Sequence, residues 1–103
     1  MREFLVFGFR GDALAELRAT VELVLGVRMA QRDGDSSGGV HYRYESSNGE
    51  WLTLQKNFIP AEQDFAETSF AEFRALLYVE DTERADELVA VLEPFARLLR
   101  RYH

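Results

Sequence analysis

The sequence contains no cysteine and only two histidines, His41 and His103. The missing thiols exclude disulfide frameworks, thiol catalysis, iron-sulfur clusters and cysteine-ligated zinc. Because two histidines make a histidine-rich metal site unexpected, we expect neither a metal nor a cofactor. No apolar run reaches the roughly 18 residues of a membrane-spanning helix, and the first residues lack the pattern of a signal peptide. We therefore expect a soluble, cytoplasmic protein that contacts no membrane.

The remaining composition is that of one globular domain. The chain has 103 residues, of which 47% are apolar and 29% are charged. A chain of this length buries roughly 60 to 70% of its unfolded surface, which suffices for one core without a metal or a disulfide. We therefore expect residues 1–103 to form a single domain.

Negative charge is concentrated in the middle of the chain. The net charge is −6, and residues 45–93 contain twelve acidic residues but only three basic ones. Residues 1–44 are balanced, and residues 94–103 are basic. Such a distribution repels phosphate backbones and anionic lipids. It disfavours nucleic acid as a partner and favours a basic protein, although acidic surfaces also serve solubility alone.

The first 32 residues predict a strand, a helix and a weaker strand. Residues 4–9 are apolar, with aromatic and β-branched side chains, which favours a buried strand. Four apolar residues then recur at the helical spacings of three and four: Leu14, Leu17, Val21 and Val24. This stripe predicts a helix over 13–25, capped by Asp12 and ended by Gly26. Residues 27–32 alternate weakly, as in a strand.

A second strand and helix lie near the end of the chain. Residues 75–79 form another apolar run, and Asp81 or Thr82 is the expected cap of a helix that Pro94 ends. The apolar stripe of this helix comprises Ala85, Leu88, Val89 and Leu92. A shift of 71 positions aligns the two units, with Leu17 on Leu88 among the identities. By this repeat, residues 95–101 form a strand, which we favour, although Pro94 also suits the first turn of a helix.

Between the two units, the sequence predicts a β-hairpin. Residues 40–45 and 51–55 alternate with a period of two, and an Asn-Gly dipeptide at 48–49 supplies the turn. A three-residue loop with a left-handed glycine pairs Tyr44 with Leu52 and Tyr42 with Leu54. A two-residue turn would mix charged residues into this apolar face, so we favour the longer loop. The opposite face then carries His41, Arg43, Glu45, Trp51, Thr53 and Gln55.

Residues 57–73 are long for a loop and contain no basic residue. They contain four acidic residues and four phenylalanines: Glu62, Asp64, Glu67, Glu72, Phe58, Phe65, Phe70 and Phe73. The aromatic content argues against disorder. We expect the phenylalanines to point inward and the carboxylates outward.

Known catalytic patterns fit poorly. Residues 34–39, Gly-Asp-Ser-Ser-Gly-Gly, are close to the surroundings of a trypsin-like nucleophile, but that chemistry needs a two-barrel scaffold and a histidine held by a buried carboxylate. A phosphate-binding loop leads into a helix, whereas a strand follows here. The acidic residues give no evidence of a cleft for glycoside hydrolysis. We expect His41 to be a surface residue, and the protein not to be an enzyme.

The candidate binding residues combine the single tryptophan with the acidic segment. Trp51 either packs under residues 57–73 or serves as the aromatic anchor of an interface. In the second interpretation Arg43 and Gln55 lie at its rim. The acidic residues that would steer a basic partner are Glu62, Asp64, Glu67 and Glu72.

Short motifs throughout the chain give a resemblance. They are Gly26-Val27-Arg28, Ser37-Gly38-Gly39 before Tyr42-Arg43, Leu54-Gln55-Lys56-Asn57, Phe70-Ala71-Glu72-Phe73, Leu76-Leu77-Tyr78-Val79-Glu80, Arg84-Ala85-Asp86-Glu87-Leu88 and Leu98-Leu99-Arg100-Arg101. With these motifs the chain resembles a group of small actinobacterial proteins of unassigned function. Small acidic α/β proteins of this kind are often suspected of being immunity proteins, which neutralise a toxin by occupying its active surface. The resemblance also implies a strand for the Leu-Leu-Arg-Arg ending.

These observations predict an α+β fold in which two βα units flank the central hairpin. The sheet is expected to be mixed, with five or six strands and both helices on one face. We expect a non-enzymatic protein-binding protein, most concretely an immunity protein that neutralises a cognate basic toxin domain. The alternative is a small ferredoxin-like regulatory or ligand-binding domain that acts as a homodimer.

Overall fold

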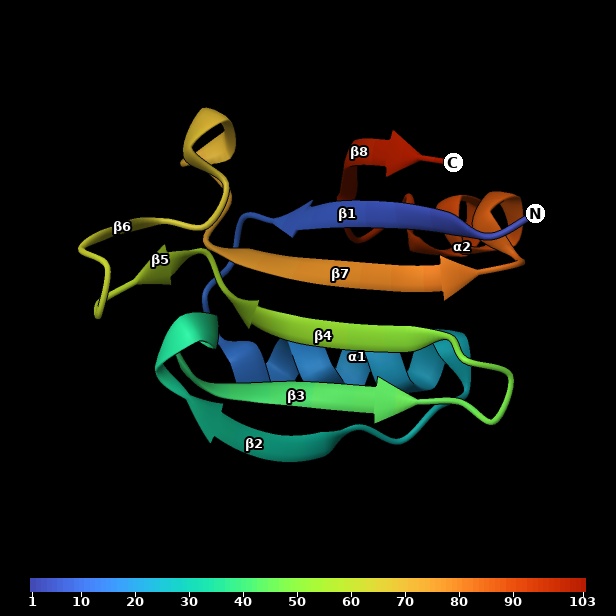
Figure 1. Ribbon diagram of the computed structural model, residues 1–103, viewed down its shortest axis with the longest axis horizontal. Coiled ribbons are helices and arrows are strands. Elements are labelled where there is room, and N and C mark those ends of the chain that lie inside the picture. Colours follow the sequence, from blue (N-terminus) through green and yellow to red (C-terminus); the bar gives the residue numbers. More distant parts are fainter.

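The computed structural model describes residues 1–103 as a six-stranded sheet with two helices (Figure 1). The elements are β1 (Glu3–Phe9), α1 (Leu14–Leu25), β2 (Ala30–Gly34), η1 (Asp35–Ser37), β3 (Gly39–Glu45), β4 (Trp51–Lys56), β5 (Phe58–Ile59), β6 (Asp64–Phe65), η2 (Thr68–Phe70), β7 (Ala75–Thr82), α2 (Ala85–Leu92) and β8 (Arg97–Tyr102). The strand order is β2-β3-β4-β7-β1-β8, and β5 and β6 form a separate ribbon. The predicted α+β class is confirmed. Neither helix is long and apolar enough to cross a membrane.

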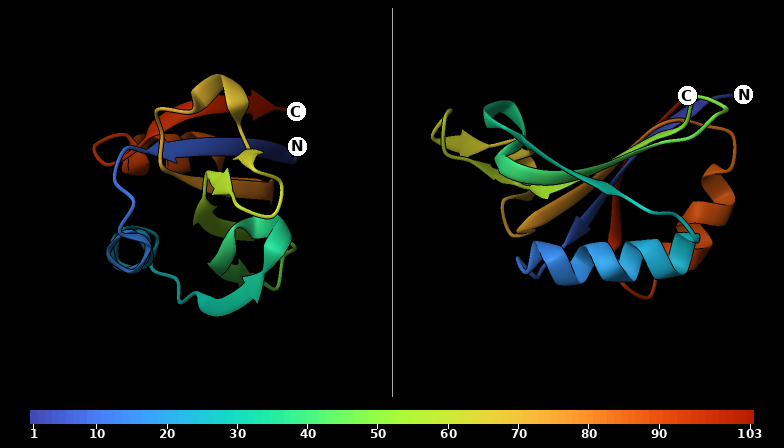
Figure 2. Two further views of the ribbon diagram at one scale, coloured as in Figure 1. Left: turned by 90° about the vertical axis from the view of Figure 1, so that its left-hand side faces the viewer. Right: turned by 90° about the horizontal axis from the view of Figure 1, so that it is seen from below.

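Two crossovers through helices produce this strand order. Every neighbouring pair in the large sheet is antiparallel, so the expectation of a mixed sheet is wrong in this detail: each helix crossover skips a strand, and no parallel pair becomes adjacent. β7 therefore separates the parallel strands β1 and β4, and β1 separates the parallel strands β7 and β8. With α1 and α2 these four strands have the split βαβ arrangement, and β2 and β3 extend the sheet at one edge. Both helices lie on the same face, as expected, so the other face is free of helices (Figure 2, right).

The core lies between the helices and the face of the sheet that they cover. Its fifteen buried apolar residues include Leu5 and Phe7 of β1, Leu77 of β7, Val21 of α1 and Leu88 of α2. These residues alternate along the strands and recur every three or four positions along the helices, as the sequence predicts. The periodicity therefore decides which residues face the helices, whereas β1 and β7 are buried on both faces, since Val6 and Leu76 are also fully buried.

The helix ends agree only in part with the sequence-based predictions. Gly26 ends α1 in the left-handed conformation, with φ +65, as expected. The prediction that Asp12 caps this helix is wrong, because α1 starts one residue later and places Ala13 at the cap without a side-chain hydrogen bond. The cap predicted for α2 is also wrong. Arg84 occupies that position, and the Thr82 hydroxyl accepts the Arg84 N–H just before the helix starts.

The central hairpin has the predicted register. Tyr42 pairs with Leu54, and Tyr44 pairs with Leu52. Gly49 has φ +94, in the left-handed region that a three-residue loop requires. The Ser46 N–H donates to the Glu50 carbonyl and closes this loop. Local alternation and one glycine therefore suffice to specify the register.

The two segments whose sequence pattern indicated a strand less clearly also form strands. β2 lies at 30–34 rather than 27–32, because Met29 is buried in the core and Val27 packs against it. The last segment is the strand β8, as favoured.

The expectation that His41 lies on the surface is wrong. His41 is only 5% exposed, and its Nδ1 lies 2.9 Å from the Gly39 carbonyl oxygen.

Residues 57–73 are ordered around one buried side chain. Asn57 is fully buried and donates from Nδ2 to the carbonyl oxygens of Phe70 and Phe73. Its Oδ1 accepts the Glu67 N–H. The phenylalanines do not all point inward as predicted: Phe73 is buried, whereas Phe58 is 44% exposed. The short ribbon that carries Phe58 projects from one end of the sheet (Figure 1).

Candidate protein-binding site

The helix-free face of the sheet carries a row of three side chains centred on Trp51. The strand registers pair Trp51 with Glu45 of β3 and with Glu80 of β7. Residues directly opposite each other on neighbouring strands point to the same face. The indole, 36% exposed, therefore has a carboxylate on each side. Both carboxylates are exposed, and neither forms an ion pair within the chain.

Arg43 lies against this row. Its guanidinium carbon is 5.1 Å from the centroid of the Trp51 ring, within the range of a cation–π contact. The guanidinium forms no ion pair, and its Nε is buried without a hydrogen-bond partner. Arg43 therefore covers part of the indole without neutralising either neighbouring carboxylate through direct contact.

Aromatic residues continue the helix-free face towards β8. The Phe4 ring lies 6.1 Å from that of Tyr78 and 5.7 Å from that of Tyr102. Between this group and the row around Trp51 is an open hollow of about 330 Å³, lined by Arg43, Tyr78 and Glu80 among others. Aromatic residues and Arg43 therefore share one open surface, and these are the residue types enriched at interface centres.

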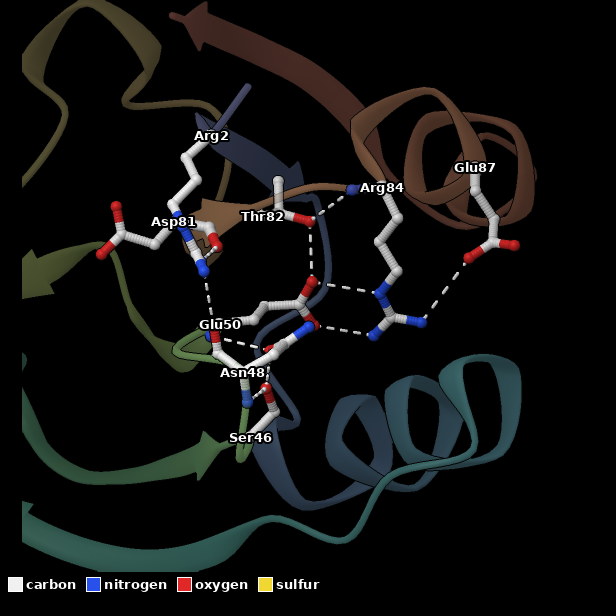
Figure 3. Close-up of polar contacts among 8 residues, drawn as sticks. All are labelled: Arg2, Ser46, Asn48, Glu50, Asp81, Thr82, Arg84 and Glu87. Atoms are coloured by element: carbon white, nitrogen blue, oxygen red, sulfur yellow. Dashed lines mark hydrogen bonds and ion pairs between the residues drawn. The ribbon is translucent and has the colours of Figure 1, made fainter.

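A buried ion pair holds the strand that carries Trp51. Glu50, directly before Trp51, is 3% exposed. It accepts hydrogen bonds from Arg84 Nη2 at 2.8 Å, Arg84 Nε at 3.1 Å and the Thr82 hydroxyl at 2.7 Å. Figure 3 shows these contacts joining the hairpin to the start of α2. Burial raises the pKa of the Glu50 carboxyl, but the bonds from Arg84 and Thr82 outweigh it and leave the pKa below its ordinary value.

Arg2 adds a second connection at the same corner. It donates to the carbonyl oxygens of Asp81 and Asn48 and pairs with Glu83 at 3.2 Å. Asp81 has φ +54, in the left-handed region that aspartate and asparagine adopt more often than other residues with a side chain. Its carboxylate points away from Glu50 (Figure 3) and belongs to no ion pair. Asp81 therefore adds an exposed negative charge beside Glu80.

The structure brings only some of the sequence-predicted binding residues together. Arg43 and Trp51 are in contact. Gln55 is buried four residues along β4, with its Nε2 bonded to the Lys56 carbonyl. The acidic residues Glu62, Asp64 and Glu72 are exposed, but lie in the segment that follows the other end of β4. The five residue steps of β4 span about 17 Å, so the length of this strand separates these three carboxylates from Trp51, although Ala66 of the same segment lines the hollow beside Arg43 and Glu80.

The carboxylate of Glu67 is not free to attract a basic partner, contrary to what the sequence had suggested. Its carboxylate accepts hydrogen bonds from the Tyr78 hydroxyl at 2.9 Å and from Arg100 Nε at 2.8 Å. Burial, and then the bond to Glu67, raise the pKa of Tyr78 above its ordinary 10.0. The Glu67 bond likewise raises the pKa of Arg100. These contacts fasten the segment 57–73 to the helix-free face.

The two acidic residues directly opposite Trp51 on the neighbouring strands were not among the predicted binding residues. Glu45 could have been identified, because the predicted hairpin register places it opposite Trp51. Glu80 could not, since its position depends on the pairing of β7 with β4, which no local pattern encodes. The buried pair of Glu50 and Arg84 was missed for the same reason, as its members lie 34 positions apart.

The charged groups do not suggest a metal centre. No group of three or more histidine, aspartate or glutamate side chains is arranged to bind a metal ion. The lowered pKa of Glu50 keeps its carboxyl ionised, the opposite of what a general acid needs. No protein-family model and no curated protein matches the chain.

Proposed function

We propose that the protein is a non-enzymatic binding protein that recognises a basic protein through the helix-free face around Trp51. The observation that carries the proposal is the row Glu45, Trp51, Glu80, in which two uncompensated carboxylates flank a partly exposed indole. The backbones of Glu45 and Glu80 are two strand spacings apart, about 10 Å. A lysine or arginine of a partner fits between them over the ring edge.

The electrostatics support a cationic partner in two ways. Exposed ion pairs in isolation contribute at most about 1 kcal/mol, but burial of Trp51 under a partner would remove water from the neighbouring carboxylates and strengthen their attraction. The more distant charges of Glu62, Asp64 and Glu72 add a long-range field that accelerates association. In this proposal Trp51 is the anchor and the outer acidic residues steer the approach.

The concrete form of the proposal is an immunity protein. A toxin that acts on an anionic substrate presents a basic surface, and an acidic protein that covers it blocks substrate access. The net charge of −6 and the resemblance to small actinobacterial proteins support this form. Glu67 has no role at the interface, since Arg100 and Tyr78 already occupy its carboxylate.

Photocrosslinking tests where the partner binds. Benzoylphenylalanine in place of Trp51 keeps an aromatic group at the centre of the face. The same group in place of Leu23, which is 84% exposed on α1, is the matched control. We expect a basic protein to crosslink at position 51 and not at position 23. The same products at both positions would overturn the assignment of the face.

Charge reversal tests the electrostatic part with the captured partner. Glu45→Lys with Glu80→Lys should weaken binding at least tenfold and abolish protection in cells that express the partner as a toxin. The control, Asp33→Lys with Asp35→Lys, changes the net charge equally at exposed positions near the β2 edge. Equal losses in both double variants would mean that net charge alone matters and would contradict the proposed site.

A homodimeric regulatory domain is the second candidate function. The split βαβ arrangement and the unpaired outer edge of β2, whose residues are exposed except for Gly34, favour it. Light scattering over a hundredfold range of concentration distinguishes the two. A constant monomer mass supports the binding protein, and a dimer whose interface covers the Trp51 face would replace it.

A further inference from the structure

The largest cavity of the molecule lies beside the β5–β6 ribbon, at the opposite end of β4 from Trp51. It measures about 530 Å³, within the range of sites that bind small molecules. Phe58, Pro60 and Phe65 supply an apolar wall, and Lys56, Arg74 and Asp12 supply the charged groups. The proposed protein-binding face does not use any of these residues.

The aromatic wall is preformed and open to solvent. The rings of Phe58 and Phe65 meet edge to face with centroids 5.4 Å apart. Phe58 is 44% exposed, so its ring is accessible from solvent. The cross-strand pairing of Phe58 with Phe65 in the ribbon holds both rings at this place. A planar apolar group could cover them with little rearrangement.

Two cations without acidic partners line the same cavity. Lys56 ends β4, and Arg74 directly precedes β7; the strand pairing of Lys56 with Ala75 places the two residues next to each other. The Asn57 N–H donates to the Arg74 carbonyl at 2.9 Å and fixes this proximity. Neither cation forms an ion pair, although acidic residues outnumber basic ones by eighteen to twelve in the chain.

The charges of the residues that line the cavity determine the charge of the ligand that fits it. Lys56 and Arg74 contribute two positive charges, and Asp12 contributes one negative charge, so a ligand with one negative charge leaves the cavity neutral. We infer that this cavity binds a small aromatic carboxylate, with its ring on Phe58 and Phe65 and its carboxylate between Lys56 and Arg74. The site is independent of the proposed protein-binding face.

Benzoate is the direct probe, and its binding is measured from the amide chemical shifts of ¹⁵N-labelled protein. We expect saturable shifts confined to residues 56–74 and to the neighbourhood of Asp12. Acetate lacks the ring and should bind at least tenfold more weakly. Benzylamine carries the opposite charge and should cause no saturable shifts. Shifts that spread over the whole chain, or that fail to saturate, would overturn the inference.

Two double substitutions distinguish binding in this cavity from a general effect of positive charge on benzoate affinity. Lys56→Met with Arg74→Met should raise the Kd for benzoate at least tenfold. Arg28→Met with Arg32→Met removes the same charge from two exposed arginines near β2 and should change the Kd less than twofold. Phe58→Ala should raise the Kd severalfold. Unfolding curves verify that each variant is folded, and an equal effect of the two double variants would contradict the site.

Discussion

Glu50 and Arg84 form a bidentate ion pair that joins two parts of the chain 34 positions apart. Glu50 directly precedes β4, and Arg84 directly precedes α2. The pair therefore fixes the strand that carries Trp51 to a helix on the opposite side of the sheet. Removal of one partner from such a buried pair leaves a polar or charged group without compensation, which is costly.

Glu50→Gln tests this pair with little change of shape. We expect the free energy of unfolding to fall by about 1 to 3 kcal/mol, because Arg84 and Thr82 lose an ionised acceptor. Urea unfolding followed by the fluorescence of Trp51 measures the change. Glu62→Gln is the control, since Glu62 is exposed and its carboxylate has no partner, and should stay within about 0.5 kcal/mol. Equal losses in both variants would contradict the role of the pair.

The same carboxyl makes stability depend on pH. The pKa of Glu50 in the folded protein lies below its ordinary value of 4.5, so between these two values the unfolded chain binds more protons. The stabilisation is complete above about pH 5.5 and is lost as pH falls through the folded pKa. Urea unfolding between pH 3 and 7 should therefore show a steeper acid loss in the wild type than in Glu50→Gln. Parallel curves would exclude Glu50 as the source.

The elements that local pattern determines could be predicted from the sequence. The apolar runs, the helical stripes and the hairpin register depend on residues within one or two elements, and the structure confirms them. The register of Tyr44 with Leu52 is an example, because an alternating pattern and one left-handed glycine exclude the competing pairings. The predicted helix caps were wrong because single residues decide them: the start of α1 lies one position later than predicted, so Asp12 is not its cap.

The candidate site depends on contacts that no local pattern encodes. Glu67 was predicted as a free acid because residues 57–73 contain no basic residue, yet Arg100 reaches it from β8, 33 positions further along. Glu80 acquires its place beside Trp51 only through the pairing of β7 with β4. The surface of an acidic protein therefore cannot be inferred from the acidic residues of one segment, because the fold decides which of them remain uncompensated.

Gly8 of β1 is required by the close approach of Phe73. A Cβ at position 8 would lie 2.7 Å from Cγ of Phe73, which is buried and cannot move freely. We expect Gly8→Ala to lower the free energy of unfolding by about 1 to 3 kcal/mol. Gly11→Ala is the matched control, since a Cβ there meets no atom within 4 Å. In a Phe73→Ala background, which removes the closest atom, Gly8→Ala should cost less than it does in the wild type. An unchanged cost would place the strain on Leu99, whose Cδ1 lies 2.9 Å from the same Cβ.

Glu67 couples the acidic segment to the sheet through Tyr78, and this coupling has a spectroscopic signature. Burial and the ionised Glu67 both raise the pKa of Tyr78, so we expect one of the four tyrosines to stay protonated well above the ordinary 10.0. Glu67→Gln removes the negative charge and should lower that pKa, seen as increased absorbance at 295 nm near pH 11 while circular dichroism confirms the fold.

The same substitution should also loosen residues 57–73, because Arg100 loses its ionic partner while the Asn57 bonds remain. Amide hydrogen exchange should therefore become faster in that segment and stay unchanged in α1 and α2. Glu72→Gln, at an exposed position in the same segment, should change neither the tyrosine titration nor the exchange. A shift of the titration without faster exchange would show that Asn57 alone holds the segment, and faster exchange in both variants would show that general charge, rather than the contact with Tyr78 and Arg100, orders it.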